Sequence, residues 1–559
     1  MGRPLKLFIN YFLSSLVFTY FIAILVLLLN PHVSVQLSTE EFLILFLNLY
    51  VFYGPLWFVL IFFIFVGVQF FSEKRYAIGV FKPHTITYFF SFTVLITAFV
   101  LYLNYDYYYG FLGGTAKSNF IRMLLINLAL VITGIVFAFF KKINRKWLQV
   151  FFLSLLVVGI VHSYSSLIRP GESVSNEGLK TLTTTPRIYV EDFKPRKIRI
   201  VLMDGLSSKL IHSLAADGKL LNFKLLLDKG VSGGIKTFKP NLTLSMMNTA
   251  LTGLKPSQFA RHSHDKFKFA KLKYKFDIRP RYIFFRKSSS INTTAFFKEK
   301  ESPFMDSLKD HYEDNDRKCV TIVNPSHVER YSEMALQRNN RFRLLFPDLL
   351  RKSSRNDENY KTLKKYFFLD NNLKNRIPSL RDSDTFYSIV SLPGLGIINH
   401  YFYQYHEPHI FGAEAEDDYE SRRYGWIIEK YYQYYDSIIG NLMTTTGENE
   451  LLVILSYFEY EPLPVWRRIL VNLFGQKDVY VYKAPESQGT ILLYEKNALK
   501  NGYSLQTVSI YDIFPTLLYY AGFQLSKDLG GEVLRQIFIE DFLLNNPINI
   551  STRERPFGQ

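Results

Sequence analysis

The stretch Ile198–Met203 (IRIVLM), followed directly by Asp204 and Gly205, decides the fold of the larger part of this 559-residue chain. A near-continuous apolar run of this length predicts a buried parallel strand. Further apolar runs of strand length alternate with helical patterns, at Cys319–Val323, Ser388–Leu392, Leu451–Leu455 and Thr490–Tyr494. This alternation predicts an α/β domain with a mostly parallel central sheet. Chemistry in such sheets gathers at the carboxyl ends of the strands, which directs attention to Asp204, to the segment after Leu392 and to the segment after Leu455.

One stretch inside this region departs from the alternation. Arg341–Asp384 is highly charged and net basic and has no strand pattern. We expect it to form a helical insertion or a cap over the edge of the sheet.

The first third of the chain is poor in charge and rich in long apolar segments. A helix that crosses a bilayer needs about 20 mostly apolar residues. Segments that meet this requirement are Leu5–Asn30, Phe42–Phe71, Thr85–Leu103, Met123–Phe140 and Trp147–Leu167. The sequence therefore predicts a bundle of about five transmembrane helices ahead of the α/β domain.

The distribution of Lys and Arg predicts the orientation of these helices. Basic residues cluster before the first span and in the loops between the second and third and between the fourth and fifth, at Arg3, Lys6, Lys74, Arg75, Lys82, Lys141, Lys142, Arg145 and Lys146. Basic loops remain on the cytoplasmic side. We expect a multi-pass protein of the cytoplasmic (inner) membrane, with a cytoplasmic N-terminus and an extracytoplasmic C-terminal domain.

These patterns predict the boundaries of the domains. Residues 1–168 form the transmembrane domain, and residues 169–197, with their Pro, Gly and Thr-rich run, form a linker. Residues 198–535 form the α/β domain, and residues 536–559 form a C-terminal tail.

Composition limits the partners and the chemistry. The formal net charge is +17, but no nucleic-acid motif accompanies it, so we expect no nucleic-acid partner. Membrane lipids, or a phosphate-bearing lipid, glycan or protein of the cell envelope, suit the charge better, and a solvated basic surface is the alternative. The single cysteine, Cys319, excludes an intramolecular disulfide and a cysteine-based zinc site.

Three blocks in the predicted α/β domain together resemble the alkaline phosphatase superfamily, in its type I phosphodiesterase/nucleotide pyrophosphatase branch. They are VLMDG (Val201–Gly205), PNLTLSMMNTALTGLKPS (Pro240–Ser257), and VSIYDIFPTLLYYAGF with LGG (Val508–Phe523, Leu529–Gly531). A weaker block, NHYFYQYHEPHIFG (Asn399–Gly412), resembles the family segment that holds a metal-binding histidine. The blocks follow one another in the family order.

The resemblance implies roles for three residues. Thr243 falls at the position of the family nucleophile, and Asp204 and His400 fall at metal-ligand positions. Two metal ions in this family activate the nucleophile and brace the attacking and leaving oxygens.

The other family ligands are replaced. The acidic ligand four residues before His400 falls on Gly396, and the Asp-His-Gly after the strand Leu451–Leu455 falls on Tyr457-Phe458-Glu459. The last histidine falls within Lys483–Pro485, which contains none. We therefore expect no cofactor. If the domain is active, zinc or manganese would bind a rearranged site in which His406, His409 or Glu459 replaces the lost ligands.

Two functions follow. The first is a non-catalytic, membrane-anchored binding, scaffold or regulatory protein of the cell envelope, that is, a pseudoenzyme in which Asp204, Thr243 and His400 are vestigial. The second is an active phosphodiesterase or phosphotransferase acting on lipid- or glycan-linked phosphoesters. The architecture resembles lipid A phosphoethanolamine transferases, lipoteichoic acid synthases and PbgA. A transporter is disfavoured, because the spans lack buried charges.

Overall fold

The structure is a computed structural model. It describes residues 3–34, 37–71, 83–139, 146–165, 195–258, 265–283, 294–298, 305–323, 340–347, 349, 357–376, 384–411, 419–465, 468–469, 481–483, 488–527 and 529–551. The chain divides into two compact units. The membrane unit is Met1–Asn176 with Pro256–Glu301, and the α/β unit is Glu177–Lys255 with Ser302–Gln559. Residues 256–301, which the sequence analysis places inside the α/β domain, thus belong with the N-terminal helices. The predicted linker lies almost wholly outside the described residues.

Long apolar helices build the membrane unit. They are α1 (Arg3–Leu29), α3 (Thr39–Phe71), α4 (Pro83–Tyr108), α5 (Gly114–Phe139) and α6 (Lys146–Ser165), with the short α2 (Pro31–Ser34) after α1. Four contain segments long and apolar enough to cross a bilayer, namely Phe8–Leu29, Thr39–Ile64, Phe89–Tyr108 and Gly114–Phe137. These segments confirm four of the predicted spans. The fifth predicted span is the helix α6, whose apolar part, Val150–Val161, is shorter.

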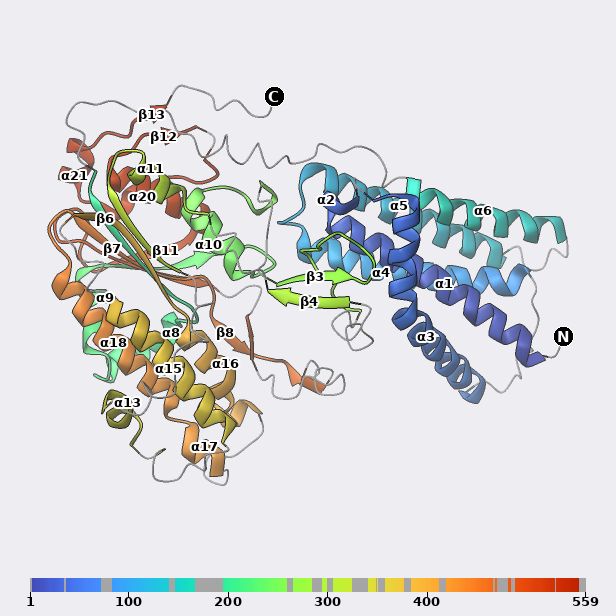
Figure 1. The fold of residues 1–559 in the computed structure, drawn as a ribbon, viewed down its shortest axis with the longest axis horizontal. Helices are drawn as coiled ribbons and strands as arrows, with labels where there is room; N and C mark the ends of the chain where they lie inside the picture. Colours follow the sequence, from blue (N-terminus) through green and yellow to red (C-terminus); the bar gives the residue numbers. More distant parts are fainter. Residues whose placement is uncertain are drawn as a thin grey trace. The chain divides into compact units, whose positions relative to one another are not determined.

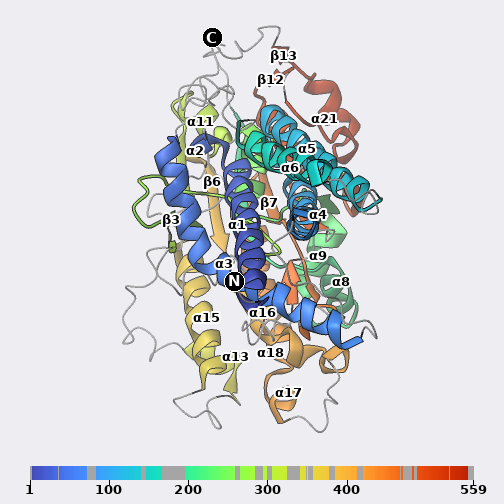
Figure 2. The ribbon, with the colours of Figure 1, turned by 90° about the vertical axis from the view of Figure 1, so that its right-hand side faces the viewer.

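The central helix of this unit is α1, which packs against α3 and α4 (Figure 2). Polar contacts join these helices inside the bundle. The Ser14 hydroxyl lies 2.6 Å from the Thr93 hydroxyl and accepts a hydrogen bond from the Trp57 indole N–H at 3.0 Å. The outward surface is apolar and exposed, for example at Leu43, Leu47 and Val51 of α3 and Leu125, Leu128 and Ile132 of α5. An exposed surface of this kind suits lipid rather than water.

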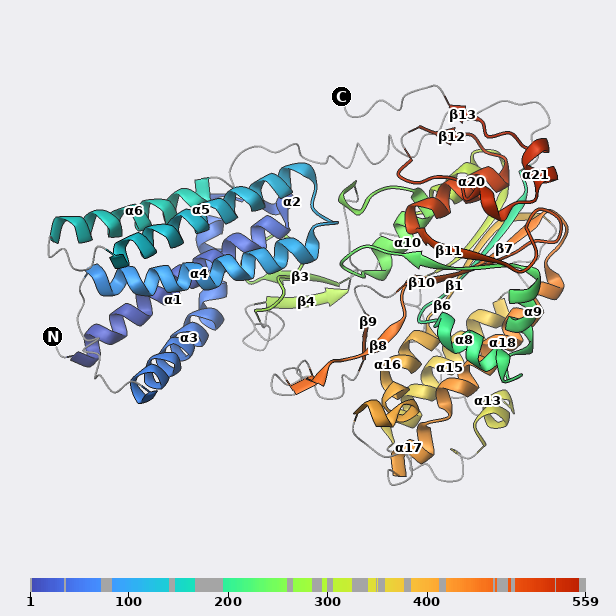
Figure 3. The same cartoon turned by 180° about the vertical axis from the view of Figure 1, so that it is seen from behind.

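The inserted part of the membrane unit contains a small antiparallel pair, β3 (Asp265–Phe269) with β4 (Thr294–Lys298), drawn beside the helices in Figures 1 and 3. The short helix η2 (Pro256–Gln258) precedes it. The rings of Phe267, Phe269 and Phe276 lie with their centroids within 5.8 Å of one another. This aromatic cluster is the core of the insertion.

A seven-stranded sheet forms the centre of the α/β unit, in the order β11-β2-β10-β7-β1-β6-β5. The strands are β1 (Lys197–Met203), β2 (Val231–Lys236), β5 (Lys318–Ile322), β6 (Thr385–Leu392), β7 (Glu450–Ser456), β10 (Gly489–Tyr494) and β11 (Tyr503–Ser509). Only β10 runs antiparallel to its neighbours. The predicted fold class is confirmed, and each of the five predicted strands is present.

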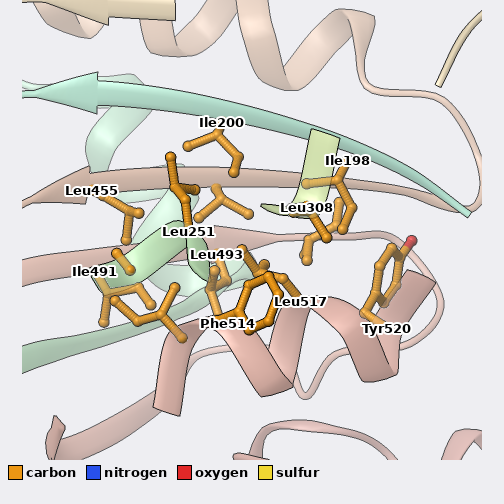
Figure 4. Close-up of a cluster of buried hydrophobic side chains, with 14 of the residues drawn as sticks. Ile198, Ile200, Leu251, Leu308, Leu455, Ile491, Leu493, Phe514, Leu517 and Tyr520 are labelled. Atoms are coloured by element: carbon orange, nitrogen blue, oxygen red, sulfur yellow. The ribbon is translucent and has the colours of Figure 1, made fainter. Parts of the chain in front are cut away.

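Helices cover both faces of the sheet (Figure 1). One face carries α10 (Thr243–Thr252), α11 (Ser307–Glu313) and α20 (Ile513–Ala521); the other carries α8 (Ser208–Ala216), α9 (Leu221–Lys229), α15 (Glu358–Arg376), α16 (Gly394–His406) and α18 (Ile427–Thr445). Side chains of a strand alternate between the faces. Ile198, Ile200 and Leu202 therefore enter the first core, and Val201 and Met203 enter the second. Figure 4 shows Phe514 and Leu517 of α20 against Ile198 and Leu493 in the first core.

The remaining described elements lie around the sheet. They are α13 (Asn340–Leu345), η6 (Pro408–Phe411), α17 (Tyr419–Tyr424), β8 (Tyr460–Pro462), β9 (Val481–Lys483), η7 (Ile510–Asp512), β12 (Leu525–Ser526), η8 (Arg535–Ile537), α21 (Glu540–Asn545) and β13 (Ile550–Ser551). The basic stretch 341–384 is helical where it is described, and its helix α15 packs on β6 and α16 as part of one helical layer. In the predicted tail, β13 pairs with β12.

Candidate functional site

Asp204 stands at the carboxyl end of β1, where the neighbouring strands β6 and β7 also end. The backbone after it turns through Gly205, whose φ of 84° is in the left-handed region that favours glycine. The Ser456 hydroxyl, at the end of β7, accepts hydrogen bonds from the N–H groups of Gly205 and Leu206, each at 3.1 Å. It also donates to the Phe458 carbonyl at 3.1 Å. Ser456 thereby fixes the turn that carries Asp204.

Gly396, at the position of the family's acidic ligand, packs directly on this turn. A Cβ atom on Gly396 would lie 3.2 Å from both the Cβ and the carbonyl oxygen of Asp204. A Cβ atom on Gly205 would lie 2.9 Å from the Cα of Gly396. The Asn399 amide, on the same helix α16, donates to the Gly205 carbonyl at 2.7 Å. The helix α16 therefore lies against the backbone of the turn, and no side chain can stand between them without displacing that backbone.

The replaced Asp-His-Gly segment is built into the core. Tyr457 and Phe458 are 0% and 1% exposed and belong to the first core cluster. Burial, together with the Asp204 carboxylate, raises the pKa of Tyr457 well above its ordinary value, so the phenol remains protonated beside Asp204. Glu459 turns toward α8, where its carboxylate accepts a hydrogen bond from the Ser208 N–H at 2.7 Å. Burial raises the pKa of Glu459 above its usual range. Carboxylates near a helix start stabilise the helix, and this contact is a sufficient structural role for Glu459.

Tyr460 links two residues that the sequence analysis places in the site. Its ring lies 6.1 Å from the His400 ring, between centroids. Burial and then the Asp204 carboxylate raise the pKa of Tyr460. Asp204 and His400 thus share Tyr460 as a common neighbour.

Thr243 is the first residue of α10, the helix that follows β2, and it is half-buried. The rest of α10 is buried from Leu244 to Thr252. The Asn248 side chain of this helix accepts a hydrogen bond from the Met305 N–H at 3.1 Å. The chain leaves the α/β unit after Lys255, shortly after the end of α10, and belongs to that unit again from Ser302.

The proposed replacement histidines are engaged elsewhere. The His406 ring lies 3.1 Å from the Gly425 carbonyl oxygen, at the end of α16 near α17. His409 is 75% exposed and lies 3.4 Å from the Glu407 carboxylate. Of the segment Lys483–Pro485, only Lys483 lies within the described residues.

The side chains present do not fit the two-ion site of the family. Gly396 supplies no donor atom, Phe458 cannot bind a metal, and Tyr457 remains a protonated phenol. Within the described parts of the chain, no three His, Cys, Asp or Glu side chains are grouped as a metal ion requires.

Sequence reasoning missed the residues that hold this site in place. Ser456 follows a predicted strand and could have been found from its position at the carboxyl end of the sheet. Asp370 of α15 gave no signal. It is fully buried, accepts hydrogen bonds from Tyr431 (2.7 Å) and Tyr435 (2.8 Å), and holds the Gly394 N–H at 3.1 Å, at the start of α16. Burial raises the pKa of Asp370 to about 7.

Comparison with known proteins identifies the family that the α/β unit resembles. Residues 200–456 match the family of type I phosphodiesterases/nucleotide pyrophosphatases. The resemblance to this branch of the alkaline phosphatase superfamily is thereby confirmed for the central part of the α/β unit.

Among solved structures, the chain is similar to murine ectonucleotide pyrophosphatase/phosphodiesterase 5, an inactive variant in complex with AMP, and to the human protein of the same name. Both are 10% identical to this chain, with a TM-score of 0.35. The alignments cover 62% and 61% of this chain and 100% of the murine and human chains. At this level of similarity neither structure bears on the activity of this protein. A comparison with curated proteins gives no match.

Proposed function

We propose that the protein is a non-catalytic, membrane-anchored member of the phosphodiesterase-like proteins, in which the former catalytic face serves binding, scaffolding or regulation in the cell envelope. The observation that carries this proposal is the contact between Gly396 and the Asp204–Gly205 turn. Gly396 supplies no carboxylate, and a Cβ atom at this position would already lie 3.2 Å from the Cβ and the carbonyl oxygen of Asp204. A threonine hydroxyl is a poor nucleophile without such an ion beside it.

The face retains features suited to an anionic partner. Thr243 begins a helix of ten residues, and the N–H groups at a helix start attract anions. A phosphate-bearing lipid, glycan or protein of the envelope is the partner class that this chemistry and the basic chain favour. The proposed binding function requires no metal ion or other cofactor.

The membrane unit supports the proposed orientation. The insertion contacts α1 and α4 near their carboxyl ends, through Asn30 and Asn104, and α3 in its first turns, through Glu41. If successive helices cross the membrane in opposite directions, the ends that contact the insertion lie on the side of the membrane opposite the N-terminus. The helix α5 then ends on the same side as the N-terminus. The chain can therefore arrive on the side of the insertion only if α6 also crosses the membrane. The 20 residues of α6 span about 30 Å, the thickness of the hydrocarbon core.

The test of this orientation is a fusion after Gln559. A reporter that is active only in the cytoplasm should be silent there. Strong cytoplasmic signal would contradict the proposed extracytoplasmic location and the crossing by α6.

The test of catalysis uses the purified full-length protein in detergent. It should contain far less than one zinc or manganese ion per chain and should leave aryl phosphodiesters and lipid-linked phosphoesters intact when either metal is added. Thr243→Ala is the informative variant, and Thr507→Ala, an exposed threonine of β11, is its control. Turnover that disappears in Thr243→Ala and persists in Thr507→Ala would overturn the proposal. It would direct attention to His406, His409 and Glu459 as replacement ligands.

A further inference from the structure

The inserted segment 265–283 is fixed to the membrane helices by side chains that bond its backbone. The Asn30 carboxamide oxygen accepts hydrogen bonds from the N–H groups of Asp277 (2.9 Å) and Ile278 (3.0 Å), and its amide donates to the Ile278 carbonyl at 2.8 Å. Asn104 makes the same kind of pair with Arg281, accepting from its N–H at 2.8 Å and donating to its carbonyl at 3.0 Å. The segment is therefore a defined part of the membrane unit.

A turn of this segment lies along α3. The Asn48 amide donates to the Ala270 carbonyl at 3.1 Å, and the Tyr274 hydroxyl donates to the Glu41 carboxylate at 3.1 Å. Glu41 and Asn48 are seven residues apart, which places them on one face of the helix, two turns from each other. The turn at Ala270 and Lys271 thus runs beside the first part of α3.

The position of this turn along α3 corresponds to the surface region of a bilayer. The 33 residues of α3 extend for about 50 Å, against a hydrocarbon core of about 30 Å. Asn48 lies about 14 Å from the start of the helix. Leu43 and Leu47, exposed by 56% and 52%, mark a lipid-facing surface that begins before Asn48. Phospholipid headgroups and the first part of their acyl chains would therefore surround the turn.

At this turn the segment forms a basic hollow. The hollow has a volume of about 470 Å³ and is lined by Lys268, Lys271 and Lys273 together with Phe269, Leu272 and Ala295. All three lysines are exposed. Lys273 lies 3.7 Å from the Glu41 carboxylate, whereas no carboxylate of the described residues forms an ion pair with Lys268 or Lys271. Two of the three ammonium groups therefore remain available to an anion.

The backbone at Lys271 is unusual for a lysine. Its φ of 62° lies in the left-handed region, which a residue with a side chain occupies at some cost. Glycine or asparagine would suit this turn better. A lysine at such a position is consistent with a role for its ammonium group.

We propose that Lys268, Lys271 and Lys273 bind the phosphate of an anionic phospholipid headgroup at the extracytoplasmic membrane surface. Lysine ammonium groups are strong partners of phosphate, and their long flexible side chains can reach from an apolar helix surface to the headgroup region. Each lysine near an anionic membrane surface contributes about a fivefold gain in affinity. This site lies in the membrane unit, so it is separate from the face around Asp204 and does not depend on the proposed loss of catalysis.

The experiment compares lipid binding by the full-length protein in detergent, using native mass spectrometry with added phosphatidylglycerol or phosphatidylcholine. The test variant is the triple substitution Lys268→Gln, Lys271→Gln and Lys273→Gln. The control is Lys361→Gln, Lys364→Gln and Lys365→Gln on α15, which changes the net charge equally. The wild type and the control should prefer phosphatidylglycerol, and the test variant should lose about 100-fold in affinity for it. A charge-conserving triple arginine variant at 268, 271 and 273 should retain the preference.

Two outcomes would overturn the proposal. One is equal phosphatidylglycerol binding by the wild type and the triple glutamine variant. The other is inorganic phosphate binding as tightly as the lipid, since this would make the hollow a site for soluble anions. If the triple variant does not fold, Lys271→Gln alone should weaken phosphatidylglycerol binding about fivefold. An unchanged affinity in this single variant would also overturn the proposal.

Discussion

Gly396 lies against Asp204 so closely that a Cβ atom at Gly396 would be 3.2 Å from the Asp204 Cβ and carbonyl oxygen. The sequence resemblance places Asp204 at a metal-ligand position of the family and Gly396 at the position of a second ligand. The absence of a side chain at Gly396 and the close packing of α16 on the turn are connected by this contact. With no side chain at Gly396 the helix α16 approaches the turn closely, and a side chain at this position would require Asp204 to shift.

The first prediction concerns this contact. Glycine inside a helix is normally less stable than alanine by about 1 kcal/mol. Gly396→Ala should instead destabilise the protein, by about 1–3 kcal/mol, because the atoms nearest the new methyl group are the Cβ and carbonyl oxygen of Asp204, which the turn holds in place. Thermal unfolding in detergent would measure it. Gly114→Ala, at the open start of α5, is the control and should be neutral or slightly stabilising. A stabilised Gly396→Ala variant would contradict the packing described here.

A second prediction concerns the asparagines that hold the insertion. Asn30→Ala leaves the buried backbone groups of Asp277 and Ile278 without their partner and should cost at least about 2 kcal/mol. Limited proteolysis should also cut residues 256–301 faster in this variant. Asn127→Ala is the matched control, because among the described residues Asn127 bonds only to Met123 of its own helix. Equal protection of the insertion in both variants would show that Asn30 does not anchor it.

The third prediction addresses the buried ion pair inside the insertion. Lys266 and Asp277 lie 3.0 Å apart, with side chains exposed by 7% and 3%. Asp277→Leu alone should cost about 3–5 kcal/mol, because it leaves a buried charge unpaired. The double variant Lys266→Met with Asp277→Leu should recover most of this loss. For comparison, removing the exposed Lys361–Glu358 pair should change stability by less than about 1 kcal/mol. A double variant as unstable as the single one would refute this account.

The fourth prediction is a dependence of stability on pH. The pKa of Asp370 is about 7 in the folded protein, against an ordinary value of 3.8, because the carboxyl group is buried. The folded state therefore binds this proton more tightly, so the contribution to stability is complete below about pH 4 and is lost as the pH rises through 7. Asp370→Asn can keep its hydrogen bonds with Gly394, Tyr431 and Tyr435 while removing the charge.

This variant should melt higher than the wild type at pH 8 and differ less from it at pH 5. The gain is at most about 4 kcal/mol, at 1.36 kcal/mol per unit of pKa shift. Asp541→Asn, at an exposed position on α21, should leave the pH profile unchanged. An Asp370→Asn profile parallel to that of the wild type would count against the raised pKa.

The strands that the sequence predicts and those that it misses differ in a physical way. The runs at β1, β6, β7 and β10 are apolar because those strands are buried between helical layers, whereas β5, at the edge of the sheet, is only partly buried. β2 (VSGGIK) carries two glycines in place of apolar residues and has no such run. A Cβ atom on Gly233 would lie 2.6 Å from the Leu505 Cβ of the neighbouring strand β11. Glycine occupies position 233 because two strands that are distant in sequence approach each other closely there. The local pattern of apolar residues cannot reveal such a contact.

The same limit applies to the site and to the insertion. The position of Asp204 follows from the strand before it, because the carboxyl end of a parallel strand is a local feature. The contact between Gly396 and Gly205 joins residues nearly 200 positions apart. The bonds of Asn30 and Asn104 to residues 277–281 likewise connect distant segments. The sequence around an asparagine near the end of an apolar helix does not predict which residue the asparagine will bond.

The insertion 256–301 has a consequence for proteolysis. A single cut between residues 177 and 194 would sever the direct covalent link from α6 to the α/β unit. The covalent connections at residues 255–256 and 301–302 would still join the α/β unit to the insertion, which Asn30, Asn104 and Tyr108 bind to the membrane helices. A single cut would therefore not release the α/β unit. Its release requires either a cut at each of the three connections or the unfolding of the insertion.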